Sequence, residues 1–261
     1  MTLFLPLRSG SSGNATYIGT RQEGILIDAG ASAKSICTEL SLAGVEPSAV
    51  RGILITHDHN DHIKGLRVLA KRLRVPVWAT VETLEGIIDT GNLDPATPAE
   101  ELSSRMELAG MEVEPFDTPH DTAHSVGFRI RSGERVIGYA TDLGRVTAEI
   151  WQGLAGADLV LIESNYEPRM LEMSAYPYYL RRRIASDRGH LSNPDCADTV
   201  RRLAEGGTAR FVLAHLSQEN NTPELALATA QAALTEAGMA EGRDYLLTVA
   251  ARSRATEPIL F

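Results

Sequence analysis

Residues 52–62 have the sequence Gly-Ile-Leu-Ile-Thr-His-Asp-His-Asn-Asp-His, in which a short apolar run is followed by three histidines and two aspartates. The apolar run predicts a buried strand and residues 63–73 predict a helix, so the polar residues lie in the loop between them. Burying so many polar groups is costly unless they bind something, and imidazole and carboxylate are ligands of zinc, manganese and iron. A solvated loop that is rich in His and Asp by chance is the alternative. The HxHxDH spacing favours metal binding, because alternate residues can face one metal while the Asp-His pair faces a second.

Outside this loop, the apolar pattern predicts a protein of sheets and helices. Strands are expected at residues 3–7, 15–18, 24–27, 52–55, 75–79, 126–130, 136–140, 159–162, 211–214 and 245–249. Helices are expected at 63–73, 147–154, 177–184, 194–203 and 223–237, with the connection 90–99 the least structured. Strands and helices do not alternate strictly, so two sheets packed together with helices outside fit better than a doubly wound sheet. One domain, residues 1–261, is favoured.

The composition is that of an ordinary globular protein. Hydrophobic residues make up 43% and charged residues 23%, which argues against a disordered or collagen-like chain. The two cysteines lie far apart in the sequence, so there is no disulfide framework, and a reducing compartment fits. The N-terminal residues do not resemble a signal peptide, and no apolar run is long enough for a membrane span. We therefore expect a cytoplasmic protein that does not contact a membrane.

Three more candidate ligands, His120, Asp142 and His215, also come directly after apolar runs, which places them at a common sheet rim. The ordered set of Asp28, the HxHxDH motif and these three residues resembles the metallo-β-lactamase superfamily over nearly the whole chain. The resemblance implies an αββα sandwich, an α/β (α+β) fold of two mixed β-sheets flanked by helices. It also implies one metal on His57, His59 and His120, a second on Asp61, His62 and His215, and a bridging Asp142. Asp28 would orient the ligand loop through hydrogen bonds, although alone it is equally an ordinary turn residue.

Two divalent ions would equip this site for hydrolysis without a protein nucleophile. Two such ions, two carboxylates and one bridging hydroxide sum to a charge of about +1, which would attract an anionic diester. Zinc and manganese are the expected metals, and iron also suits the ligands. Asp61 and Asp142 are therefore catalytic candidates as well as metal ligands.

Three further segments narrow the class of hydrolase. Residues 9–14 (Ser-Gly-Ser-Ser-Gly-Asn), 189–193 (Gly-His-Leu-Ser-Asn) and 215–221 (His-Leu-Ser-Gln-Glu-Asn-Asn) together resemble the YycJ/WalJ group of DNA exonucleases. By resemblance to related nucleases, His190 contacts the phosphate and protonates the leaving oxygen, and Glu163 is its acidic partner. The alternative for His190 is a purely structural histidine. His124 is more consistent with a supporting or surface role than with a ligand.

The same segments contain candidate substrate contacts. A Gly/Ser/Asn loop offers backbone amides and polar side chains for a phosphate, here those of Ser12 and Asn14, although it is equally consistent with a plain β-turn. Ser192 and Asn193 are candidates from the second segment.

The formal net charge of -9, taken globally, predicts repulsion from nucleic acid. When charge is counted by segment, it favours contact with nucleic acid instead. Residues 62–74 contain five Lys or Arg and no acidic residue, and residues 176–202 contain six Arg against three Asp. Tyrosines 176, 178 and 179 precede arginines, including the candidate contacts Arg181 and Arg182, and this mixture suits base stacking and phosphate binding. A solvated amphipathic helix is the alternative. Only 72 residues separate Asp142 from His215, too few for a β-CASP insertion.

These features favour a dinuclear-metal phosphodiester hydrolase, best described as a 5′-to-3′ DNA exonuclease that uses a metal-bridging hydroxide. RNA is a further candidate substrate. The alternatives are a small-molecule cyclic phosphodiesterase, another hydrolase of the same fold, or a metal-binding regulatory protein without turnover. The sequence leaves the metal, the cleavage polarity and the oligomeric state open.

Overall fold

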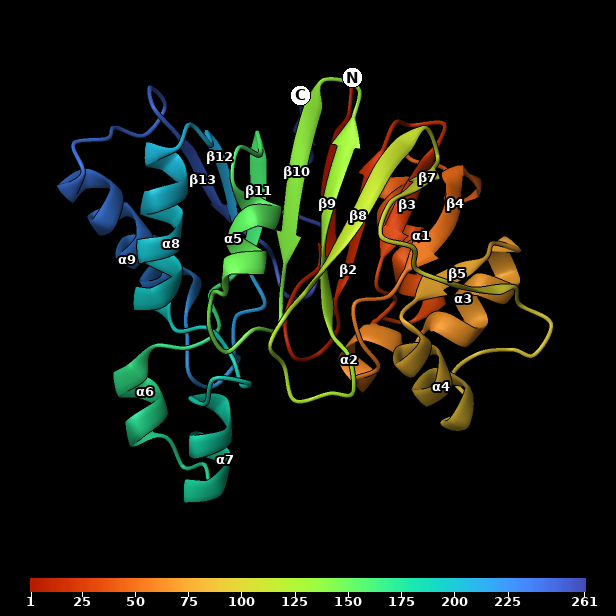
Figure 1. Ribbon diagram of the computed structural model, residues 1–261, viewed down its shortest axis with the longest axis horizontal. Helices are drawn as coiled ribbons and strands as arrows, with labels where there is room; N and C mark the ends of the chain where they lie inside the picture. Colours follow the sequence, from red (N-terminus) through yellow and green to blue (C-terminus); the bar gives the residue numbers. More distant parts are fainter.

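Two mixed β-sheets of seven strands each lie face to face in the computed structural model, which describes residues 1–261 (Figure 1). Helices cover the outer face of each sheet, so the layers are helix, sheet, sheet, helix. The predicted αββα sandwich is confirmed. The two chain ends lie together at one edge, where β1 pairs with the C-terminal strand.

The first sheet has the strand order β14-β1-β2-β3-β4-β5-β6. Strands β1 to β3 are antiparallel neighbours, whereas β3 to β6 are parallel. The strands are β1 (Leu3–Arg8), β2 (Ala15–Gly19), β3 (Gly24–Ile27), β4 (Val50–Leu54), β5 (Val77–Ala79), β6 (Ala99–Glu101) and β14 (Ile259–Leu260).

The second sheet has the order β13-β12-β11-β10-β9-β8-β7. Strands β7 to β10 form an antiparallel meander, and β10 to β13 are parallel. The strands are β7 (Met106–Leu108), β8 (Met111–Asp117), β9 (Val126–Ser132), β10 (Arg135–Ala140), β11 (Leu159–Glu163), β12 (Arg210–Ala214) and β13 (Leu246–Val249).

Helices lie over both sheets, and one pair projects from the body. Against the first sheet lie α1 (Ala33–Leu42), the 3₁₀ turn Pro47–Ala49, α2 (Asn60–Ile63), α3 (Leu66–Leu73) and α4 (Val81–Asp89). Against the second lie α5 (Ala148–Leu154), α8 (Asn193–Glu205) and α9 (Pro223–Glu236). The projecting pair, α6 (Pro168–Met173) and α7 (Tyr178–Ile184), extends below the second sheet in Figure 1. No helix is both long and apolar enough to cross a membrane.

Side-chain alternation along the strands separates the apolar interior into three layers. In β1, for example, Leu3, Leu5 and Leu7 pack toward the helices, whereas Phe4 packs between the sheets. Each such side chain contributes roughly 1.5–3 kcal/mol when fully buried. The middle layer therefore fixes the two sheets to each other, and with them the loops that each sheet carries.

All of the strands predicted from the sequence are present, with ends that agree to within two residues. The predicted helix 63–73 is instead two helices that are separated at Gly65. A Cβ at Gly65 would lie 1.8 Å from the carbonyl oxygen of Ala31, so this close approach requires glycine. Helices α1, α4 and α6 and strands β6, β7, β8 and β14 were not predicted.

Candidate metal centre

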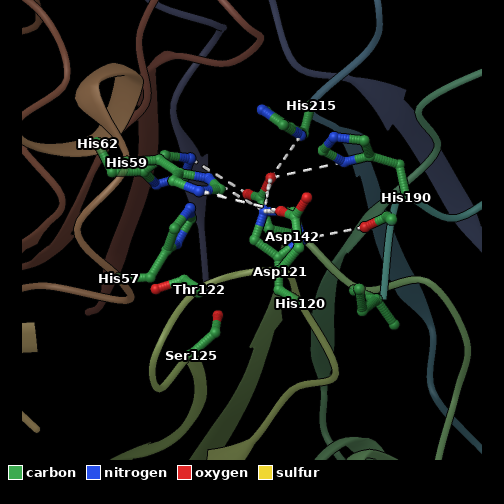
Figure 2. Close-up of polar contacts among 12 residues, drawn as sticks. His57, His59, His62, His120, Asp121, Thr122, Ser125, Asp142, His190 and His215 are labelled. Carbon is green, nitrogen blue, oxygen red and sulfur yellow. Dashed lines mark hydrogen bonds and ion pairs between the residues drawn. The ribbon is translucent and has the colours of Figure 1, made fainter. Parts of the chain in front are cut away.

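The predicted ligands meet at one edge of the sandwich, where β4, β8, β10 and β12 end (Figure 2). His57 and His59 lie in the β4–α2 loop and Asp61 and His62 in the short helix α2, and the loops after β8, β10 and β12 carry one ligand each. Asp28, Asp142 and His215 have φ values of 62°, 57° and 55°. This left-handed conformation costs about 1–3 kcal/mol for a residue with a Cβ, and it turns each side chain sharply out of the strand direction.

One donor group consists of His57, His59 and His120. Nδ1 of His120 donates to the carbonyl oxygen of Gly189 at 3.0 Å, which leaves a lone pair on Nε2, 3.2 Å from Nδ1 of His59. Burial, together with the neighbouring imidazole of His62, holds the pKa of His57 well below its usual value. The three rings therefore bring one nitrogen each to within 4.8 Å of the others.

A second donor group consists of Asp61, His62 and His215. Nε2 of His62 is 3.7 Å from Oδ2 of Asp61, and Nε2 of His215 is 3.4 Å from the same oxygen. Burial lowers the pKa of His215, but the nearby carboxylates, above all Asp142, have the larger and opposite effect. The pKa is therefore raised to about 10. Protons and cations therefore compete for these nitrogens.

Asp142 lies between the two groups, and the histidines converge on it in Figure 2. Its Oδ1 is 3.7 Å from Nε2 of His120, and its Oδ2 is 3.2 Å from Nε2 of His62. Burial alone would raise the pKa of Asp142, but His215 and His62 hold it well below the usual range. An ionised carboxylate in this position can contact ligands of both groups.

The residues present fit divalent metal ions. Nε2 of His57 and Oδ2 of Asp142 are buried and have no hydrogen-bond partner. Leaving such an atom unsatisfied costs roughly 1–3 kcal/mol, which metal coordination would offset. Imidazole nitrogens and carboxylate oxygens are the donors that zinc, manganese and iron accept.

Asp28 supports the ligand loop from beneath. Its fully buried carboxylate accepts a hydrogen bond from the Thr56 amide at 2.9 Å and another from the Thr56 hydroxyl at 3.0 Å. Nδ1 of His62 donates to the same carboxylate at 2.7 Å, which directs Nε2 of His62 toward the donor cluster. Thr56 was not among the predicted site residues, although its place between the apolar run and the first histidine was a usable signal.

Asn14 lies inside the protein, not on a substrate-facing surface as predicted. It is 2% exposed, and its side-chain nitrogen lies 2.9 Å from Nε2 of His62. Its backbone amide donates to the carbonyl oxygen of Asp61 at 2.8 Å. The SGSSGN loop therefore supports the ligand loop at this position, and Asn14 helps to place both Asp61 and His62.

Ser192 and Asn193 are also buried, in contrast to the prediction of substrate contact. Ser192 is the N-cap of α8 and accepts from the amide of Asp195, because a helix start leaves amides without partners. The side chain of Asn193 bonds to Ser164 and Asn221. Both residues thus stabilise the segment that carries His190. Ser12 is exposed, as a surface contact requires.

His190 and Glu163 form the predicted pair. Nδ1 of His190 donates to Oε1 of Glu163 at 2.8 Å, and Nδ1 of His215 donates to the same oxygen at 2.8 Å. Oε2 of Glu163 accepts from the amides of Leu143 and Leu191, so the buried carboxylate is fully bonded. Burial lowers the pKa of His190, but the carboxylates of Glu163 and Asp142 raise it above the usual value.

A cavity of about 250 Å³ opens onto this cluster. One side carries metal-ligand candidates and His190, and the other carries side chains of the α6–α7 connection and α7. The lining residues are Ser11, His59, Asp61, Asp142, Asn165, Tyr176, Leu180, Arg183, Ile184, His190, His215 and Ser217. Arg181 and Arg182, the predicted substrate contacts, do not line it, whereas Arg183, which was not predicted, does.

His124 lies outside the donor groups. Its Nε2 bonds to Asp117 at 2.9 Å and its Nδ1 to Glu82 at 3.1 Å, with its side chain 34% exposed. These contacts agree with the surface or supporting role expected from the sequence.

An αββα sandwich with a cavity-facing cluster of imidazoles and carboxylates defines a metallohydrolase of the metallo-β-lactamase type. Residues 23–216 match the family model of the Beta-lactamase superfamily domain, so the chain belongs to this superfamily, within the group that contains the exonucleases YycJ and WalJ.

The relatives extend over nearly the whole chain. Exodeoxyribonuclease YycJ of Bacillus anthracis is 36% identical over 93% of this chain and 92% of its own. Exodeoxyribonuclease WalJ of Streptococcus pneumoniae is 33% identical over 92% of this chain and 90% of its own. The crystal structure of Zn²⁺-bound PqqB from Methylobacterium extorquens matches the fold with a TM-score of 0.74 at 16% identity, over 98% of this chain and 100% of the other. The protein is a metal-dependent hydrolase.

Proposed function

We propose that this protein is a dinuclear-metal phosphodiesterase that removes nucleotides from DNA in the 5′-to-3′ direction. One observation carries the proposal: His190, supported by the buried carboxylate of Glu163, lines the same cavity as both metal-donor groups. The names of the two relatives, both exodeoxyribonucleases, support DNA as the substrate. Under this proposal residues 1–261 act as one cytoplasmic domain without a β-CASP insertion.

His190 acts as the general acid. Glu163 fixes the proton at Nδ1 and raises the pKa, so the imidazole holds a second proton on Nε2. This proton passes to the oxygen of the departing nucleotide as the ester bond breaks. His57, His59 and His62 do not have this role, because they belong to the groups that would hold the metals.

The two donor groups would hold the metals, and Asp142 lies between the two groups. His57, His59 and His120 would hold one ion, and Asp61, His62 and His215 would hold the other. Two such ions, whether zinc, manganese or iron, supply a water of pKa near 7 and positive charge for the diester oxygens. Asp28 and Glu163 keep the histidines in the required tautomer.

A digestion panel tests the proposal. Single- and double-stranded DNA and RNA, each labelled at the 5′ end, are incubated with the protein and Mn²⁺ or Zn²⁺. A 5′-to-3′ exonuclease releases labelled mononucleotide from the start, whereas opposite polarity produces a ladder of shortened labelled strands. The Asp142→Asn variant is the inactive control. Failure to digest any DNA with any metal would exclude the proposal.

Salt dependence separates DNA from a small diester as the substrate. Several phosphate contacts release several counterions, so the apparent affinity for DNA falls steeply with ionic strength. A compact cyclic diester carries a single phosphate and shows a shallow slope. Hydrolysis of cyclic diesters with a shallow slope, and without DNA digestion, would support the alternative function.

A further inference from the structure

The cavity contains one guanidinium. Among its lining residues Arg183 is the only Lys or Arg, and it lies on α7. Tyr176 and Leu180 line the same side. This side of the cavity therefore offers a cation beside an aromatic and an aliphatic surface, whereas the other side offers histidines and carboxylates.

Arg183 is held by its inner nitrogen. Its Nε donates to Oδ2 of Asp121, and no partner binds its two terminal nitrogens. Asp121 directly follows His120, and its Oδ1 is 3.5 Å from Nε2 of that histidine. One carboxylate thus fixes the guanidinium beside the donor cluster while the fork of terminal nitrogens stays free. A free guanidinium fork binds phosphate oxygens in bidentate fashion.

The neighbouring arginines lack this geometry. Nη1 of Arg181 donates to the carbonyl oxygen of Glu172, and Arg182 is exposed outside the cavity. Arg188 donates to the carbonyl oxygens of His120 and Thr122, which fixes the loop after β8. Only Arg183 combines a free fork with a position in the cavity.

We propose that Arg183, oriented by Asp121, binds a second phosphate of the substrate, adjacent to the phosphate that is cleaved, with Tyr176 and Leu180 against the nucleoside between them. The proposal rests on the proposed function, because the cleaved phosphate is taken to lie at the donor groups. Asp121 lies between Arg183 and His120. The guanidinium therefore binds a phosphate next to the cleaved one, and not the cleaved phosphate itself. A substrate with two phosphates is therefore favoured over a single diester.

Short thymidine substrates test this directly. TpT carries only the cleaved phosphate, whereas pTpT and TpTp add a second phosphate on its 5′ or 3′ side. For the metal-loaded wild-type protein, one of these two isomers has a kcat/KM about 10-fold to 100-fold above that of TpT, as a charge-assisted contact provides. The preferred isomer shows on which side of the cleaved bond Arg183 acts.

The Arg183→Gln variant abolishes the preference, mainly through a higher KM. Arg183→Lys, which keeps the charge without the fork, retains part of it. Arg169→Gln removes a charge from exposed α6, outside the cavity, and keeps the full preference. The metal content and Tm of each variant show that it is folded and loaded.

Two outcomes would overturn the inference: no preference in the wild type, or a preference that survives Arg183→Gln, whether activity is unchanged or falls equally on TpT and the preferred isomer. Equal losses would mean that Arg183 only supports the loop of His120. Bis(p-nitrophenyl) phosphate keeps the two proposals distinct. A protein that hydrolyses this diester but no thymidine substrate contradicts the proposed function itself.

Discussion

Oε1 of Glu163 accepts a hydrogen bond from Nδ1 of His190 at 2.8 Å. The carboxylate is fully buried, whereas the imidazole reaches the cavity. Such a pair determines which nitrogen carries the fixed proton and leaves Nε2 to exchange a proton with substrate. The role of His190 as general acid depends on this contact. Substrates whose leaving groups differ in their need for a proton can measure that role separately.

Replacing His190 with Gln removes the acid and keeps the size of the side chain. The kcat for DNA falls by about 100-fold to 10,000-fold, the usual contribution of a general acid. Bis(p-nitrophenyl) phosphate loses much less, because p-nitrophenolate departs without a proton. Steady-state kinetics on both substrates measures the difference. Equal losses on the two substrates would contradict the assignment of His190 as the acid.

Replacing Asp28 with Asn disturbs the metal centre from beneath. The hydrogen bond to Nδ1 of His62 is weakened, so metal affinity falls by about 10-fold to 100-fold. Competition with a chelator of known affinity measures this change. Asp58→Asn is the matched control. Asp58 lies in the β4–α2 loop between His57 and His59, but it bonds to Thr122 and belongs to neither donor group. Unchanged affinity in Asp28→Asn, or equal loss in both variants, would exclude the orienting role.

The contacts of His124 predict a pH-dependent contribution to stability. Burial lowers the pKa of His124, but Asp117 and Glu82 raise it above the usual value. A raised folded-state pKa means that this stabilisation is complete below the unfolded pKa of about 6.5, and is lost as the pH rises through the folded value. His124→Gln thus lowers the free energy of unfolding at about pH 5.5, by at most about 1 kcal/mol for such an exposed pair.

Urea unfolding of wild type and His124→Gln measures this difference. At about pH 9 the two proteins have nearly equal stabilities, because His124 is neutral in both the folded and unfolded states. Glu82→Gln removes one partner and shows a smaller effect of the same sign. A difference that is constant with pH, or grows as the pH rises, would refute the prediction.

Much of the site was predictable because its signals are local. The HxHxDH spacing and the polar residues directly after apolar runs depend only on strands that end at one edge, and the structure has this arrangement. Strand β8 was missed because Pro115 interrupts it, even though Glu112 and Glu114 alternate with Met111 and Val113 as in a half-buried strand. Helix α1 was missed even though Ser32 caps it and Ile36 and Leu40 have helical spacing.

The directions of single side chains were not predictable in this way. A loop of Ser, Gly and Asn usually indicates an exposed turn, yet Asn14 is buried against Asp61. This packing needs Gly30, at which a Cβ would lie 1.6 Å from the carbonyl oxygen of Asp61. Likewise, the choice of Arg183 over its neighbours depends on Asp121, from a distant loop. Both cases depend on tertiary contacts that leave no local pattern.

The most direct test of the whole account is a metal titration of the nuclease. Metal-free protein receives Mn²⁺ in steps while the release of mononucleotide from 5′-labelled DNA is followed. If both donor groups must be filled for catalysis, release rises steeply as the second equivalent per chain is added and then reaches a plateau. Full activity at one equivalent would contradict the dinuclear centre. No release at any metal level would contradict the assignment as a DNA exonuclease.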